Sequence, residues 1–204
     1  MERWTRAQAA FPVVVSGPSG VGKTSVVDRL LLQDPRCVRS VSATTRPPRG
    51  DEVDGQSYSF VGGAKFEELQ RGGHLAESAV YNGAWYGTPK SFLESRIAAG
   101  FCVVMNIEVQ GGFQVRGHYP DALLIFILPP SWEALRQRLL GRGTDGPEAV
   151  EGRIRRAHEE LAEVGKYDYV IVNDDLESCA ADLTAIIRAE RRRVSRLRRF
   201  AAEG

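Results

Sequence analysis

The stretch that decides the fold is Gly17-Pro18-Ser19-Gly20-Val21-Gly22-Lys23-Thr24, which fills every fixed position of the phosphate-binding pattern G-x-x-x-x-G-K-[ST]. A β-branched run at 13–15 precedes this loop and predicts a buried strand. Residues 25–32 follow it with apolar side chains at helical spacing. The loop is therefore predicted to join a strand to a helix, where backbone N–H groups and the helix N-terminus bind phosphate.

Two side chains of this loop have predicted chemical roles. We expect Lys23 to act catalytically by reaching the β- and γ-phosphate oxygens of a nucleoside triphosphate, and Thr24 to offer its hydroxyl directly to Mg²⁺. A chance glycine-rich turn before a helix is the alternative, and the match at every fixed position argues against it. The motif predicts phosphate binding and leaves the phosphoryl acceptor open.

Length and composition are those of an ordinary globular chain. Its 204 residues are 43% hydrophobic and 26% charged, which is enough to bury one sizeable core. The formal net charge of +1 gives no overall field toward nucleic acid or a membrane surface. Cys37, Cys102 and Cys179 are widely spaced and odd in number, which predicts a reduced, cytoplasmic setting without disulfides or a zinc site. We find no signal peptide and no stretch approaching the roughly 20 apolar residues of a membrane span.

Apolar runs alternate with helical patterns along most of the chain. Strand-like runs fall at 12–16, 102–107, 123–128 and 169–172. Helical patterns fall at 24–32, 90–99, 131–140, 148–164 and 176–193. This alternation predicts an α/β fold in which a parallel sheet is covered by helices on both faces.

Two stretches interrupt the alternation. Residues 40–87 are rich in Gly, Thr, Pro and Tyr, and are predicted to form a small, mostly β insertion beside the main sheet. Residues 141–154 carry glycine and arginine and are predicted to form a mobile lid over a phosphate site. The chain is thus predicted to be a single domain with core segments at 11–39, 88–140 and 155–195 and a basic end at 188–204.

A second motif, SVSATTRPPR at 40–49, predicts another phosphate pocket. Its prolines hold the backbone extended, and three residues per turn would place Arg46 and Arg49 on one face. Two guanidinium groups converging on one side suit a phosphate. A solvated basic loop is the alternative for this segment taken alone.

The motifs together resemble those of guanylate kinases. GPSGVGKT, SVSATTRPPRGDEVDGQSYSF, WYGTP, GRGT and VIVND occur in the family's order, and the resemblance spans residues 11–188. The tract ending in Tyr58 is far more specific to the family than the phosphate-binding loop. The resemblance implies an enzyme of purine nucleotide metabolism that uses ATP, with Mg²⁺ as cofactor, to phosphorylate GMP and also dGMP.

The resemblance also implies roles for individual residues. One set binds the GMP phosphate, for which cations and phenols are suited: Arg46, Arg49, Tyr58 and Tyr86. A second set reads the guanine ring: Ser42, Glu77 and Thr88. A third set lies on the ATP side, where arginines close over the transferring phosphoryl group and an asparagine lines the adenine: Arg138, Arg142, Arg153 and Asn173. Of these, Arg142 and Arg153 are expected to be catalytic together with Lys23.

Glu77 is predicted to select the base. A carboxylate only accepts hydrogen bonds, and guanine presents adjacent N1–H and N2–H₂ donors. Adenine lacks both donors, so the carboxylate would stay unpaired at a cost on the order of several kcal/mol. A glutamate at a strand edge is ordinarily solvated, and the position of Glu77 in the motif order argues against that interpretation.

One tract departs from the family pattern. The family has two carboxylates, two residues apart, before a Gln-Gly pair, whereas this chain has Asn106 and Glu108 before Gln110 and Gly111. Strand alternation predicts both side chains on one face. Glu108 is expected to approach the guanine amino group or to orient a water on Mg²⁺. The neutral Asn106 is expected to alter metal handling and turnover.

Two other functions stay open at this point. A related kinase acting on a ribose phosphate would not need the predicted GMP-pocket residues together. A catalytically weak guanylate-kinase-like interaction module would bind phosphopeptides through the GMP pocket, but is expected to lose the ATP loop, which is intact here. The arginine-rich stretch from Arg188 onward is a weak hint of RNA or membrane binding, and a solvated helix end is favoured. Monomer and homo-oligomer are both compatible with the sequence.

Overall fold

A parallel sheet forms the centre of this computed structural model, which describes residues 9–81, 83–140 and 147–197. The neighbouring strands are, in order, β2 (Cys37–Arg39), β7 (Cys102–Asn106), β1 (Pro12–Ser16), β8 (Leu123–Leu128) and β9 (Tyr169–Val172). All of these pairings are parallel, and Val13 of β1 lies opposite Val104 on one side and Leu123 on the other. The central strand is buried along its whole length, as a strand covered on both faces requires.

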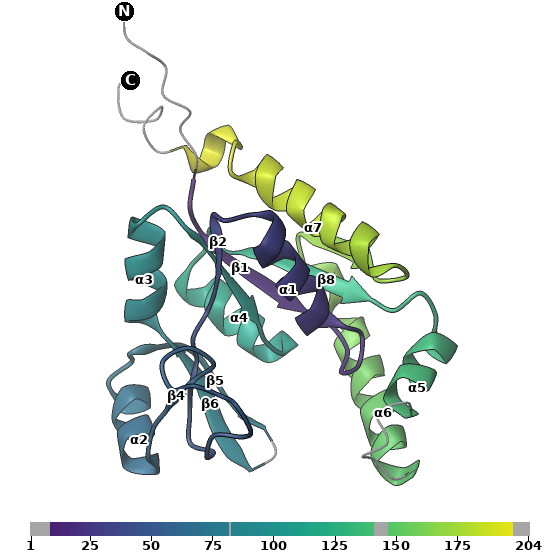
Figure 1. Cartoon of the computed structure of the whole chain (residues 1–204), viewed down its shortest axis with the longest axis horizontal. Helices are drawn as coiled ribbons and strands as arrows, with labels where there is room; N and C mark the ends of the chain where they lie inside the picture. Colours follow the sequence, from purple (N-terminus) through teal and green to yellow (C-terminus); the bar gives the residue numbers. More distant parts are fainter. Residues whose placement is uncertain (1–8, 82, 141–146, 198–204) are drawn as a thin grey trace, which may run out of the picture.

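Helices cover both faces of this sheet (Figure 1). On one face α1 (Lys23–Gln33) and α7 (Leu176–Glu190) share a core with Val13 and Val15. On the other face α3 (Lys90–Ala98) and α4 (Val109–His118) share a core with Val14. Successive side chains of β1 therefore enter opposite cores, and each fully buried valine contributes roughly 1.5–3 kcal/mol of hydrophobic stabilisation.

A second, smaller sheet lies in the predicted insertion. Its strands follow the order β4 (Ser59–Phe60), β3 (Ala43–Thr44), β6 (Ala84–Pro89) and β5 (Leu75–Tyr81). The β3–β4 pairing is parallel, and the pairings of β6 with β3 and β5 are antiparallel. Between β4 and β5 the chain forms α2 (Gly63–Arg71), whose Phe66 packs on Ala43 and Leu75 of this sheet.

A pair of helices follows the main-sheet strand β8. These are α5 (Trp132–Leu140) and α6 (Pro147–Ala162), joined by the packing of Leu135, Leu139, Ile154 and Ala157. Figure 1 shows the pair at the lower right and the smaller sheet with α2 at the lower left. Residues 141–146, and with them Arg142, lie outside the described residues. The predicted lid boundary at 154 falls inside α6, and a short 3₁₀ turn, η1 (Val164–Lys166), leads on to β9.

The predicted α/β architecture and its main strands and helices are confirmed, and several elements and boundaries differ. The elements β2, α2 and α4 were not predicted, so the insertion contains a helix as well as strands. β7 ends at Asn106, one residue earlier than predicted. α7 ends at Glu190, and the turn η2 (Val194–Arg196) follows it. None of the described helices combines the length and apolar character needed to cross a membrane.

Candidate active site

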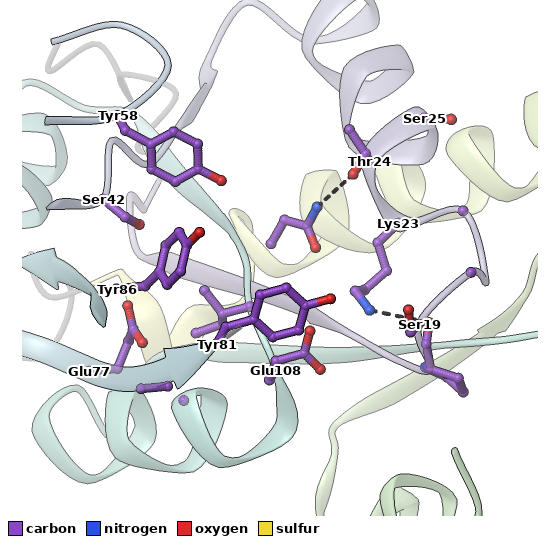
Figure 2. A pocket seen from close by; sticks show the side chains of 17 residues that line it. Ser19, Lys23, Thr24, Ser25, Ser42, Tyr58, Glu77, Tyr81, Tyr86 and Glu108 are labelled. Atoms are coloured by element: carbon purple, nitrogen blue, oxygen red, sulfur yellow. Dashed lines mark hydrogen bonds between the residues drawn. The ribbon is translucent and has the colours of Figure 1, made fainter. Parts of the chain in front are cut away.

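A cavity of about 370 Å³ lies where three parts of the chain meet. The 17–24 loop and the start of α1 line one side, the smaller sheet lines another, and the junction of β7 with α4 completes it. Figure 2 shows Lys23 and Thr24 across this cavity from Tyr58, Tyr86 and Glu77. The fold therefore brings the predicted triphosphate-binding loop and most of the predicted acceptor residues to a single cavity. The lining of this cavity does not include Arg46, Arg49 or Thr88.

Glycine fixes the shape of the 17–24 loop. Gly17 has φ 145°, and a Cβ at this position would lie 2.3 Å from the carbonyl oxygen of Ile127 in β8. Gly22 has φ 99°, and a Cβ there would lie 2.5 Å from Nδ2 of Asn173. Any other residue would be strained at both positions, because only glycine adopts positive φ without cost and leaves room for such close neighbours.

Lys23 begins α1 and turns its side chain back over the loop. Its Nζ donates to the carbonyl oxygen of Gly17 and, at 3.3 Å, to that of Pro18. The ammonium group thus lies at the wall of the cavity that the loop lines (Figure 2).

Arg138 and Asn173 hold the same loop through its backbone. The carbonyl oxygen of Val21 accepts from Asn173 Nδ2 at 2.7 Å and from Arg138 Nη1 at 3.3 Å. Arg138 Nη2 also donates to the Asn173 carbonyl oxygen at 3.0 Å. Two predicted ATP-side residues, one from α5 and one from the turn after β9, therefore fix the position of the loop in this structure.

The three predicted base-reading residues form one hydrogen-bonded chain. The Glu77 side chain on β5 is buried, and its Oε1 accepts from the Thr88 hydroxyl at 2.7 Å. Ser42 Oγ lies 3.0 Å from Thr88 Oγ1 and donates to it, because the Thr88 proton is engaged with Glu77. Burial raises the pKa of the Glu77 carboxyl, and the hydrogen bonds from Thr88 partly offset that rise.

Gly111 of α4 makes room for the second oxygen of this carboxylate. A Cβ at Gly111 would lie 3.2 Å from Glu77 Oε2. The sequence pattern does not predict the helix that carries Gly111, so the Gln110-Gly111 pair alone does not reveal this approach to Glu77. The glycine therefore matters here because the helix backbone passes close to a buried carboxylate.

Arg46 is held by a carboxylate that the sequence analysis missed. Its Nη1 and Nη2 donate to the two oxygens of Glu52 at 2.6 and 2.7 Å, while its Nε donates to Tyr86 Oη at 3.0 Å. Glu52 also accepts from the Arg49 backbone N–H at 2.9 Å. The Arg46 hydrogen bonds lower the pKa of the Glu52 carboxyl to about 2. The spacing of Glu52 from Arg49 was the available signal, because a glutamate side chain in a turn can accept from the backbone N–H three residues earlier.

The two tyrosines predicted beside Arg46 pack against each other and against its guanidinium group. The rings of Tyr58 and Tyr86 meet edge to face, with centroids 5.9 Å apart. The Arg46 guanidinium carbon lies 4.8 Å from the centroid of Tyr58. Arg46, Tyr58 and Tyr86 are thus held together as a unit, whereas the Arg49 side chain is exposed.

The junction of β7 and α4 differs from its predicted form. Asn106 is the last residue of β7, whereas Glu108 lies beyond the strand as the N-cap of α4, so strand alternation does not set its direction. Both side chains nevertheless line the cavity. Asn106 Nδ2 donates to Thr24 Oγ1 at 3.1 Å.

Glu160 of α6 is a further residue that the sequence analysis missed. Burial and the neighbouring Glu108 carboxyl raise its pKa, and the positive charge of Lys23 acts in the opposite direction. Arg153, also on α6, is partly exposed and does not belong to the cavity lining. Within the described ranges there is no group of three or more His, Cys, Asp or Glu residues that could hold a metal.

Comparison with known proteins agrees with this arrangement. The family model for guanylate kinase matches residues 9–190. A guanylate kinase of Nitrosomonas europaea is 47% identical over 178 residues, which cover 87% of this chain and 89% of the relative. One from Gloeobacter violaceus is 49% identical over 176 residues, which cover 86% of this chain and 84% of the relative.

The fold leads to the same family. The crystal structure of guanylate kinase from Anaplasma phagocytophilum superimposes with a TM-score of 0.73 and 31% sequence identity. The match covers 94% of this chain and 90% of the solved one. Sequence and structure therefore agree that the chain belongs to the guanylate kinase family.

Proposed function

We propose residue roles for the activity of this enzyme, the ATP-dependent phosphorylation of GMP to GDP. The observation that carries the assignment is that one cavity joins the phosphate-binding loop to the buried carboxylate of Glu77. Triphosphate chemistry and guanine selection are the two requirements of a GMP kinase. Neither the ribose phosphate kinase nor the interaction module accounts for both features in one cavity.

On the acceptor side, Glu77 receives the guanine N1–H and N2–H₂ donors. Its Oε1 is fixed by Thr88, which Ser42 supports in turn, so the carboxylate is oriented before the base arrives. The GMP phosphate binds at the group formed by Arg46, Arg49, Tyr58 and Tyr86. Glu52 holds the Arg46 guanidinium group in place, and the phenol oxygen of Tyr86 accepts a hydrogen bond from Arg46 Nε.

On the donor side, the 17–24 loop wraps the β- and γ-phosphates with backbone N–H groups. Lys23 transfers its hydrogen bonds from the Gly17 and Pro18 carbonyls to phosphate oxygens. Arg138 and Asn173 keep the loop in shape, and Asn173 also faces the adenine side. Arg142 and Arg153 act on the transferring phosphoryl group when the lid at 141–154 closes together with the insertion at 40–87.

Magnesium is the cofactor that we propose for ATP. The oxygen donors at the cavity suit this hard cation: the Thr24 hydroxyl would hold it directly, and Glu108 would act through a water. The Asn106 side chain, hydrogen-bonded to Thr24, would offer a neutral oxygen where a carboxylate would add charge. The cation would supply positive charge to neutralise the phosphates of ATP.

The transfer itself needs alignment and charge neutralisation. An oxygen of the GMP phosphate forms a bond to the γ-phosphorus as the bond from that phosphorus to the β–γ bridging oxygen breaks, which releases ADP. The attacking oxygen is already anionic, so no general base is required. Lys23 and the arginines hold the two phosphates in line and balance their charge.

We also propose a cytoplasmic location, which the free thiols of Cys37, Cys102 and Cys179 support.

A coupled assay of ADP release with GMP, dGMP, AMP, CMP and UMP tests the function. We expect turnover with GMP and dGMP and at most traces with the other three. Equal turnover with AMP, or none with GMP, would contradict the proposal.

A further inference from the structure

Tyr81 extends the tyrosines of the acceptor site toward the phosphate-binding loop. Its ring meets that of Tyr86 edge to face with centroids 6.3 Å apart, and Tyr86 meets Tyr58 in the same way. The three rings therefore form a continuous row, which we call the tyrosine row. Figure 2 shows the Tyr81 hydroxyl at the end of this row that points toward Lys23, above Glu108.

The register of β5 explains why Tyr81 faces the cavity. Side chains two residues apart share a face of a strand, and Glu77, Ala79 and Tyr81 all line the cavity. A rise of about 3.3 Å per residue places Tyr81 roughly 13 Å beyond Glu77 along the strand. A nucleotide whose base is bound at Glu77 and whose phosphate is bound at Tyr58 and Tyr86 would therefore extend along β5 in the direction of Tyr81.

We propose that Tyr81 Oη donates a hydrogen bond to the phosphoryl group in transit between ATP and GMP, which makes Tyr81 a catalytic residue. The assignment rests on the proposed function, since it places GMP between Glu77 and the tyrosine row. Tyr58 and Tyr86 bind the acceptor phosphate beside Arg46, whereas Tyr81 lies farther along the row, nearer Lys23. A phenol is a suitable donor here because it offers a proton without adding charge.

In this arrangement two residues contact the γ-phosphoryl group from different sides of the cavity. Lys23 approaches it from the donor loop, and Tyr81 approaches it from the acceptor sheet. A donor that meets charge developing in the transition state raises kcat more than it lowers KM. The effect of removing the Tyr81 hydroxyl should therefore appear in kcat.

The test is Tyr81→Phe, which keeps the ring contact with Tyr86 and removes only the hydroxyl. We expect kcat to fall about tenfold, with KM for GMP and the thermal midpoint unchanged. Binding of a bisubstrate ligand, adenosine and guanosine joined by five phosphates, should weaken about tenfold while binding of GMP alone stays the same. Tyr119→Phe is the matched control, because Tyr119 donates to Glu94 at 3.3 Å away from the cavity.

Three results would overturn the assignment. Unchanged kcat and unchanged bisubstrate affinity would make Tyr81 a surface residue. A rise in the GMP dissociation constant at constant kcat would make it part of the ground-state acceptor site. Wild-type protein without GMP-dependent ADP release would contradict the proposed function itself, and the assignment of Tyr81 with it.

Discussion

Asn106 donates its Nδ2–H to the hydroxyl oxygen of Thr24 at 3.1 Å, which ties the end of β7 to the first turn of α1. This bond occupies a lone pair of the oxygen that we assign to Mg²⁺. A carboxylate at the same position would accept the Thr24 proton instead and leave both lone pairs of that oxygen for the cation. We therefore expect the neutral side chain to give the site a weaker hold on Mg²⁺ than an acid would give.

Asn106→Asp should lower the Mg²⁺ concentration that gives half-maximal activity by about tenfold, since an added carboxylate attracts the cation and frees Thr24. The measurement is ADP release at fixed ATP over a series of Mg²⁺ concentrations. Asn106→Ala, which removes the amide without adding charge, serves as the control. If Asn106→Asp left the Mg²⁺ dependence unchanged, the pair of Asn106 and Thr24 would have no part in metal handling.

Gly111→Ala should weaken GMP binding about tenfold, because the new methyl group would press on Glu77 Oε2 at 3.2 Å and displace the carboxylate. Gly117→Ala lies on the same helix with no atom within 4 Å of its Cβ, and provides a matched control with wild-type affinity. Calorimetric titration with GMP distinguishes the two variants. Equal affinities would show that the carboxylate does not need this space.

The preference for GMP over AMP should fall as the pH is lowered from neutral into the acidic range. Burial raises the pKa of Glu77, so this carboxyl takes up a proton at a higher pH than a solvated glutamate and then stops accepting from guanine. Below the raised pKa the ratio of the two kcat/KM values should drop about tenfold per pH unit. Titration of the nucleotide phosphates affects both substrates and cancels in the ratio. A ratio that stays constant over this range would place base selection elsewhere.

Asp34→Ala should lower the free energy of unfolding by about 3 kcal/mol, because it leaves the buried Arg191 guanidinium without its counter-charge. Arg191 Nη1 donates to Asp34 Oδ2 at 2.7 Å, and its other nitrogens contact the sulfurs of Cys102 and Cys37 at 3.3 and 3.1 Å. Chemical denaturation measures the loss. Glu68→Ala, which breaks an exposed pair with Lys65, should leave stability unchanged. A loss of similar size in both variants would contradict the role of burial.

The main sheet was predictable because its strands are short apolar runs and the loop at 17–24 fixes the first β–α unit. The helix α4 was not, because it carries glycines where helical periodicity would require larger apolar residues. A Cβ at Gly112 would lie 3.1 Å from Val14 of the central strand. The backbone of α4 therefore packs directly on the sheet, and the helix lacks the stripe of large apolar side chains by which helices are predicted. The edge strand β2 is only three residues long, which is too short for a pattern.

The order of the motifs along the chain indicates the predicted site residues. It does not indicate the residues that hold those side chains in position. Glu160 resembles an ordinary solvated acid in the sequence, and only the fold brings it to Glu108. Tyr81 lies in a hairpin where an aromatic residue carries no motif. Contacts between distant segments set the role of Glu160, and the local sequence does not encode such contacts. Glu52 differs, because it lies six residues from Arg46 and its local spacing was an available signal.

Base selection by Glu77 is tested most directly by measuring kcat/KM for GMP and for AMP in the wild type and in Glu77→Gln. Wild-type protein should prefer GMP by about 10³-fold or more, because the buried carboxylate meets two donors on guanine and none on the matching edge of adenine. Glu77→Gln keeps the size and removes the charge, so it should lose GMP activity steeply while the phosphate pocket still binds the monophosphate weakly. Full GMP preference in Glu77→Gln would contradict this and show that the base is read elsewhere, with Glu108 as the next carboxylate in the cavity.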